Sequence, residues 1–232
     1  MQTQLTQSVP VSLLEELLSI AMGRGASAAD IYVERTTASS VSLEEKKIRA
    51  TAHSVSMGVG IRVIAGTEVG YAYCDDLDPA ALKKTAEVAA SIAKEGGSPG
   101  PIQIKACPVP NRYPINVAPD SIAPAEKVAL LKRGDEVAHA YDPRITQVMG
   151  SFSDSTKDIL IATSDGTLVD DRRTMCRLSF MAMVIDEKGE RHTGSHGGGG
   201  RVGFDFFTDF NPEMVATEAA RMATSQIGAG AA

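Results

Sequence analysis

Hydrophobic residues along this chain follow two periodicities, one typical of helices and one typical of strands. Near the N-terminus, apolar positions three and four apart predict a helix that stops at Gly23 and Gly25. Ser12 and Glu15 have the spacing of a capping box at its start. The face predicted to be buried consists of Leu13, Leu14, Leu17, Leu18, Ala21 and Met22.

Alternating apolar positions then predict an antiparallel meander with one buried face. The candidate strands lie around residues 31–33, 41–43, 59–63 and 69–73, the last two joined across Ala65-Gly66. Asp78-Pro79 predicts the start of a second helix, whose apolar stripe from Leu82 to Ala93 stops at Gly96-Gly97. The first domain, residues 1–97, is therefore expected to be helix, strands, helix.

A proline-rich stretch follows and separates the two halves of the chain. Six of the eleven prolines fall between residues 96 and 120, which disfavours regular hydrogen bonding. We therefore predict a linker over residues 98–120. Its apolar residues suggest that it packs along a surface; they are Ile102, Ile104, Val109, Tyr113, Ile115 and Val117.

The second half, residues 121–232, repeats the order helix, sheet, helix. A helix is predicted after Pro124, and another from Asn211-Pro212 to Gly228. Strand patterns lie between them, at 145–152, 159–163, 167–169, 176–184 and from Glu190 onward. We predict an α+β fold of two domains, each a largely antiparallel β-sheet flanked by helices.

Charge and composition narrow the classes of partner. A net charge of −6 and an aromatic content of 5% argue against direct nucleic-acid binding, which favours basic surfaces and stacking aromatics. No signal peptide or membrane span is recognisable in the sequence. Cys74, Cys107 and Cys176 lack the Cys-x-x-Cys spacing of a zinc knuckle or redox motif, which fits a cytoplasmic protein.

The segment HTGSHGGGGR, residues 192–201, is the candidate site. If it is extended, His192 and His196 lie about 13 Å apart, too far to share a zinc ion easily. A phosphate cradle would need a following helix and a Walker-type lysine, and neither is predicted. A glycine hairpin between strands remains open, as does a backbone edge against which a peptide lies as an added strand. The candidate substrate-binding residues are Gly197, Gly198, Gly199, Gly200 and Arg201.

No catalytic constellation is recognisable in these 232 residues. None of the four histidines is followed by glutamate, so the His-Glu helix of zinc hydrolases is absent from the sequence. The cysteines have no histidine at a spacing that suggests a thiol nucleophile. We therefore predict no catalytic residue and no metal ligand in this chain.

Two stretches resemble a known family. GVGIRVIAGTEVGYAYCDDLDPAAL (58–82) and DRRTMCRLSFMAMVIDEKGERHTGSHGGGGRVGFDFF (171–207) are similar to the first and second domains of the TldD/PmbA family. The glycine run followed by arginine and an aromatic residue resembles the TldD branch. The resemblance implies a cytoplasmic zinc metallopeptidase of two subunits, TldD-type and PmbA/TldE-type, that processes or degrades peptides and unfolded small proteins.

The resemblance also implies a third domain, which would carry His-Glu-x-x-x-His and the zinc ion. No position of this chain matches that motif, so we expect the chain to be the substrate-shaping and assembly region of the peptidase and to be inactive alone. The alternative is a freestanding, non-catalytic assembly module that pairs with a subunit or with itself. The family's older label, modulator of DNA gyrase, adds a protein partner of gyrase type to that alternative.

Overall fold

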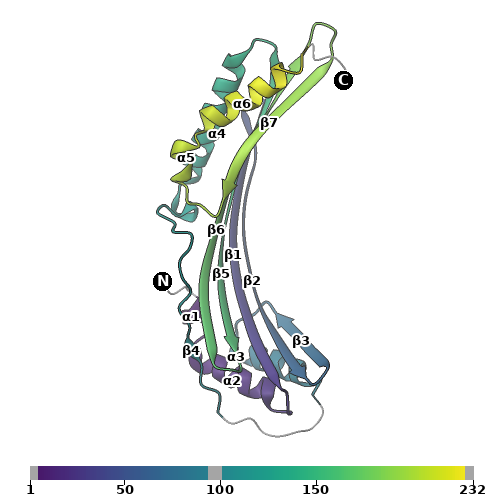
Figure 1. Ribbon diagram of the computed structural model, residues 1–232, viewed down its shortest axis with the longest axis vertical. Helices are drawn as coiled ribbons and strands as arrows, with labels where there is room; N and C mark the ends of the chain where they lie inside the picture. Colours follow the sequence, from purple (N-terminus) through teal and green to yellow (C-terminus); the bar gives the residue numbers. More distant parts are fainter. Residues whose placement is uncertain (1–4, 94–100, 228–232) are drawn as a thin grey trace. The chain divides into compact units, whose positions relative to one another are not determined.

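A computed structural model describes residues 5–93 and 101–227. In this part of the chain the fold is α+β, as predicted, with helices beside a largely antiparallel sheet (Figure 1). The helices are α1 (Leu5–Ser8), α2 (Val11–Met22), α3 (Pro79–Ala90), α4 (Pro124–Tyr141), α5 (Phe206–Asp209) and α6 (Pro212–Thr224). The strands are β1 (Ala28–Glu44), β2 (Lys47–Ala65), β3 (Glu68–Cys74), β4 (Lys105–Ala106), β5 (Ile145–Thr163), β6 (Thr167–Ile185) and β7 (Arg191–Gly200).

The strands are longer than the sequence suggested. Candidate strands at 31–33 and 41–43 are both parts of β1, those at 145–152 and 159–163 are both parts of β5, and 167–169 and 176–184 are both parts of β6. Polar residues in the middle of each strand made the pattern look interrupted. The first half of β2 was missed because its side chains are mostly exposed and give no apolar alternation.

Contacts divide the chain into two compact units that are interleaved in sequence. Of the described residues, unit 1 contains those within 1–36, 55–111 and 157–173, and unit 2 contains those within 37–54, 112–156 and 174–232. The predicted domains, 1–97 and 121–232, are by contrast consecutive. Interleaving follows from strand length, because β1, β2, β5 and β6 each contribute residues to both units.

In unit 1, α2 and α3 pack together over one side of the strands. The predicted hairpin at Ala65-Gly66 is present, with Ile61 opposite Ala72 and Gly66 at φ 63°. The alternating pattern predicts that Val69, Tyr71 and Tyr73 are the buried positions of β3. This prediction was wrong, because those three side chains are exposed and Gly70 and Ala72 lie on the helical side. Gly70 is required there, since a Cβ would collide with the Ala89 carbonyl of the segment that packs on it.

The start of α2 differs from the predicted capping box. Pro10 is the N-cap residue, and no side chain caps the helix. Glu15 instead accepts a hydrogen bond from the Ile104 backbone N–H at 3.1 Å. Together with the parallel pairing of β4 to β6, this bond fixes part of the proline-rich stretch against unit 1, where Ile104 is buried. Residues 98–100 of the predicted linker lie outside the described residues.

The other predicted helix starts agree with the structure. Asp78 accepts hydrogen bonds from the N–H groups of Ala80 and Ala81, and Asn211 accepts one from Met214. The predicted ends were too late, because α3 ends at Ala90 and α6 at Thr224. Gly96, Gly97 and Gly228, the expected stop signals, lie outside the described residues.

In unit 2, α4 and α6 lie side by side and cover one face of the strands (Figure 1). Phe152 and Phe180 are fully buried beneath them. Gly134 and Gly150 are required because a Cβ at either position would meet the Phe180 ring. Over the described part of the chain, no helix is long and apolar enough to cross a membrane.

Candidate functional site

The candidate segment, residues 192–201, lies almost entirely in β7. A turn over residues 186–190 joins β6 to β7: the Asp186 N–H donates to the Glu190 carbonyl at 3.0 Å, and Gly189 adopts φ 81°. The strands then pair antiparallel from Ile185 opposite Arg191 to Cys176 opposite Gly200. The glycine run is thus part of a strand in regular register. It does not form the glycine hairpin that the sequence left open.

Close packing explains most of these glycines. A Cβ at Gly194 would collide with the backbone of α6 at Ala219 and Ala223. At Gly198 it would lie 2.6 Å from the Phe210 ring, and at Gly197 2.7 Å from the Leu178 carbonyl. Gly199 has φ 156° and would bring a Cβ against the Cys176 carbonyl, whereas nothing lies within 4 Å of a Cβ at Gly200. Only Gly200 therefore has room for a side chain.

One edge of β7 faces away from β6. In an antiparallel pair, residues alternate between bonding the neighbouring strand and directing both backbone groups outward. Because Asp186 and Glu190 form a bonded pair, Thr193, Ser195, Gly197 and Gly199 are the outward-directed residues. The Gln226 side chain confirms this alternation, since it donates to the Thr193 carbonyl at 2.7 Å.

Arg201 follows directly after β7. Its guanidinium lies over the Tyr113 ring, 4.2 Å from the centroid, in a cation–π contact. Its Nε is buried and, within the described residues, has no hydrogen-bond acceptor. An unsatisfied buried donor is costly, so a ligand oxygen at this position would be favourable.

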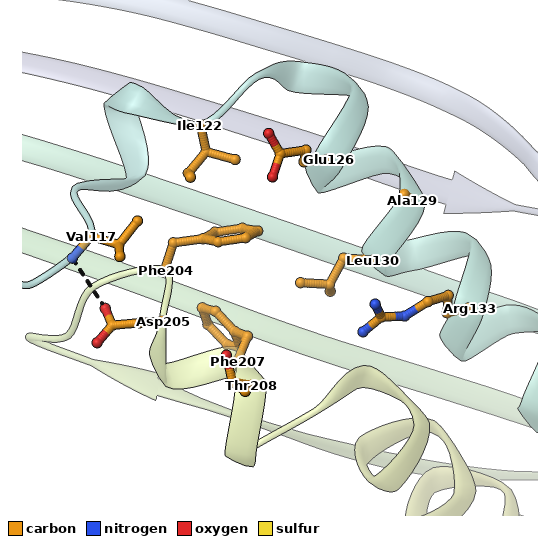
Figure 2. Close-up of a pocket in the computed structure, with 10 residues that line it drawn as sticks. All are labelled: Val117, Ile122, Glu126, Ala129, Leu130, Arg133, Phe204, Asp205, Phe207 and Thr208. Carbon is orange, nitrogen blue, oxygen red and sulfur yellow. Dashed lines mark hydrogen bonds between the residues drawn. The ribbon is translucent and has the colours of Figure 1, made fainter.

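A cavity of about 570 Å³ lies just beyond Arg201 in the same unit. Figure 2 shows its lining: Phe204 and Phe207 come from the segment that follows β7, and α4 supplies Leu130 and Arg133. Asp205 anchors this segment, because its carboxylate accepts hydrogen bonds from the Val117 N–H and the Asn116 side chain. The end of β7 therefore adjoins an aromatic hollow with charged groups at its margin.

The two histidines do not meet. His192 Nε2 lies 3.1 Å from Asp186 Oδ2, whereas His196 packs against the Phe210 ring, 6.0 Å between centroids. The hydrogen bond from His192 holds the pKa of Asp186 below its usual value. The structure therefore places the two imidazoles in different surroundings.

Sequence reasoning missed a buried polar cluster in unit 2. Lys127 Nζ donates to Asp154 Oδ2 at 2.6 Å and to Ser39 Oγ at 2.9 Å, and Ser39 donates to the same carboxylate at 2.6 Å. Both charged side chains are about 5% exposed. The sequence did carry a signal for this cluster. Asp154 is two residues after the buried Phe152 in β5, so its side chain faces the same, buried side of the strand. Because the buried ammonium and carboxylate bond directly to each other, the cluster is a structural ion pair.

Two family models match the chain. The PmbA/TldA metallopeptidase domain 1 matches residues 29–93, and the PmbA/TldA metallopeptidase central domain matches residues 118–227. A metalloprotease TldD homolog of Haemophilus influenzae is 33% identical over 238 residues, covering 99% of this chain and 49% of that relative. A TldD homolog of Buchnera aphidicola from Schizaphis graminum is 31% identical, covering 77% of this chain and 37% of that relative.

Solved structures show the same fold. A candidate modulator of DNA gyrase from Thermotoga maritima superposes with a TM-score of 0.77 at 21% identity, covering 95% of this chain and 49% of that one. TldE from Thermococcus kodakarensis gives 0.65 at 19% identity, covering 91% and 47%. The chain thus spans about half the length of the relatives that it matches. The two family models and the TldD homologs show that the chain belongs to the PmbA/TldD metallopeptidase family.

Proposed function

We propose that this chain is the substrate-shaping and assembly region of a TldD-type zinc metallopeptidase that acts on peptides and unfolded small proteins in the cytoplasm. Similarity to proteins named TldD metalloproteases supports the reaction class. The zinc ion and the His-Glu-x-x-x-His motif would belong to the part of these relatives that the match to these 232 residues does not cover. Alone, the chain would then hydrolyse no peptide.

The outward edge of β7 is the observation that carries this proposal. Ser195, Gly197 and Gly199 direct their backbone groups outward, so an extended peptide can pair with them as an added strand. Backbone pairing selects extended chains without selecting a sequence, as trimming of diverse peptides requires. At the end of the strand, the Arg201 guanidinium would donate to a carbonyl or carboxylate oxygen of that peptide.

A proline at Ser195 tests strand addition. Ser195 is exposed, and its N–H points away from β6, so Ser195→Pro removes one donor from the outer edge while leaving the β6–β7 bonds intact. Ser195→Ala is the matched control, because it removes the hydroxyl and keeps the N–H. We expect a fluorescein-labelled, unstructured peptide to bind the control like the original chain and to bind Ser195→Pro at least tenfold more weakly in anisotropy titrations.

Unfolding midpoints in urea must accompany these titrations. Equal affinity for both variants, at similar midpoints, would refute binding at the β7 edge. Gly200→Ala supplies a second control, since a methyl group there meets nothing within 4 Å. Substitutions at Gly198 or Gly199 are unsuitable, because they would disturb the packing of β7 itself.

Assembly is the second part of the proposal. The likeness to TldE, together with the family, supports a PmbA/TldE-type subunit as partner, with self-association as the alternative. Size-exclusion chromatography with light scattering on the chain, alone and mixed with a PmbA/TldE-type protein, distinguishes the two. A mixture that elutes as two separate monomers would contradict assembly through these domains.

A gyrase-directed protein interaction is a second candidate function. It is favoured by the two structural neighbours, from Thermotoga maritima and Bacteroides thetaiotaomicron, that are described as candidate modulators of DNA gyrase. A change in gyrase supercoiling on addition of the purified chain would support it. Unchanged supercoiling, with no co-elution of chain and gyrase, would exclude it.

A further inference from the structure

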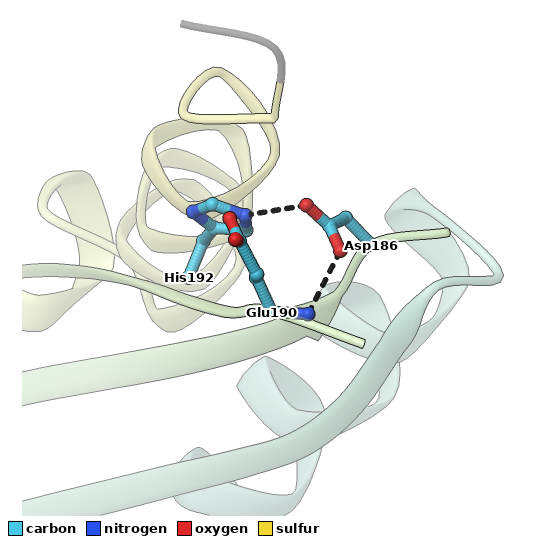
Figure 3. A group of neighbouring side chains, drawn as sticks. All are labelled: Asp186, Glu190 and His192. Carbon is cyan, nitrogen blue, oxygen red and sulfur yellow. Dashed lines mark hydrogen bonds and ion pairs between the residues drawn. The ribbon is translucent and has the colours of Figure 1, made fainter. Parts of the chain in front are cut away.

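The turn between β6 and β7 gathers three side chains that can ligate a metal. Asp186, Glu190 and His192 each place one possible ligand atom within 4.8 Å of the others (Figure 3). Among the described residues, this is the one group of three such side chains that could hold a metal ion. All three come from seven consecutive residues, DEKGERH. The group lies at the opposite end of β7 from Arg201, so it is separate from the candidate peptide site.

The turn fixes the orientation of the Asp186 carboxylate. Its Oδ1 accepts the backbone N–H groups of Lys188 at 2.9 Å and Glu190 at 2.8 Å. This leaves Oδ2 directed at the imidazole, with His192 Nε2 3.1 Å away. Such a distance between two donor atoms is close to that of neighbouring ligands on one ion, whose bonds are about 2 Å long.

The neighbouring strand residues complete the set. Glu190 and His192 are two apart in an extended segment, so their side chains project to the same face. Figure 3 shows the Glu190 carboxylate beside the imidazole. The imidazole is 19% exposed and the Asp186 side chain 11%, whereas Glu190 is exposed. One side of the group is therefore open to solvent, and an ion could enter there.

We propose that this turn binds a divalent transition-metal ion of the zinc class, through His192 Nε2 and one oxygen each from Asp186 and Glu190. An imidazole with two carboxylates favours zinc and related ions over calcium or magnesium, which prefer oxygen ligands alone. The metal would replace the proton shared between His192 and Asp186, and Lys188 and Glu190 backbone amides would hold the carboxylate from behind. The site is distinct from the zinc site of the proposed peptidase.

Zinc titration of the untagged chain tests the proposal. Isothermal titration calorimetry with zinc should give a stoichiometry of one ion per chain. The same titration with magnesium should give no heat of binding at this site. We expect His192→Gln and Glu190→Gln to weaken zinc binding at least tenfold. His196→Gln is the matched control, because it removes a histidine from the same strand that lies outside the group.

The two ligand variants, His192→Gln and Glu190→Gln, differ in what else they disturb. His192→Gln also removes the contact with Asp186, whereas Glu190→Gln leaves that contact and the backbone of the turn unchanged. A chain that binds no zinc, or binds it equally well in both variants, would overturn the proposal. Loss in His196→Gln instead would place the ion elsewhere and overturn it as well.

Discussion

At the scale of single residues, burial governs the chemistry of Cys176. Its thiol is buried on the helical side of β6, and burial, followed by the nearby Asp154 charge, raises the pKa of the thiol to about 12. Only the thiolate reacts, so at pH 8 we expect iodoacetamide to modify Cys107, which is exposed, well before Cys176. Peptide mapping by mass spectrometry measures the order, and Cys176 should react only after addition of urea. Early modification of Cys176 in the folded chain would contradict this.

The buried Lys127–Asp154 pair gives a second residue-scale prediction. Removing one partner leaves an uncompensated charge in the core, so Lys127→Met should lower the free energy of unfolding by about 3–5 kcal/mol. Lys83→Met is the matched control, because its pair with Glu16 is 39% and 50% exposed and should cost less than about 1 kcal/mol. Urea denaturation of both variants measures the difference. Equal losses would mean that Lys127 is solvated in solution.

At the scale of elements, the packing of α6 on β7 depends on Gly194. The backbone of α6 occupies the space that a side chain at Gly194 would need, and backbone cannot move aside as a flexible side chain can. We expect Gly194→Ala to cost about 1–3 kcal/mol or more through overpacking, and Gly200→Ala to stay within about 0.5 kcal/mol. Thermal unfolding measures both. A Gly194→Ala chain as stable as Gly200→Ala would show that α6 does not lie against β7 as described.

Elements also differ in how far the sequence predicts them. The helix starts at Asp78 and Asn211 were predictable because a side-chain cap is a local interaction between residues two or three apart. The start of α4 at Pro124 was predictable because proline fits the first turn of a helix. Strand length was not, because β1 and β5 continue through polar segments that are held by their neighbours in the sheet. The capping box at Ser12 was wrong for a related reason: Glu15 bonds to Ile104, a residue 89 positions away.

At the scale of the whole molecule, carboxylates with lowered pKa values make stability depend on pH. Arg144 hydrogen bonds lower the pKa of Asp142 to about 2, and bonds from Thr163 and Thr167 lower that of Asp165. For Glu34, burial acts to raise the pKa, but hydrogen bonds from Tyr32, Lys157 and Thr36 outweigh it and lower the value. The pKa of Asp135 is raised by burial, which acts in the opposite direction.

A lowered pKa means that the folded chain binds fewer protons than the unfolded chain. Its stabilising contribution is present above the unfolded value, about 4, and is lost as pH falls through the folded value. We therefore expect the urea midpoint to be level above about pH 5 and to fall between about pH 4 and pH 2. Because none of the three carboxylates with lowered pKa values is fully buried, the fall should be shallow and salt-dependent. A midpoint that rises on acidification would contradict the balance of charges described here.

The sequence by itself determined the α+β class, the starts of α3, α4 and α6, the turn at Ala65-Gly66 and the membership suggested by residues 58–82 and 171–207. These depend on local hydrogen bonding and on side-chain periodicity, which a linear pattern records. Only the tertiary structure decided that the glycine run is a strand with an outward edge, that Arg201 lies on Tyr113 and that His192 meets Asp186 rather than His196. Pairing register and strand length decide those contacts, because a strand turns its side chains to alternate faces and its partner fixes which groups stay free.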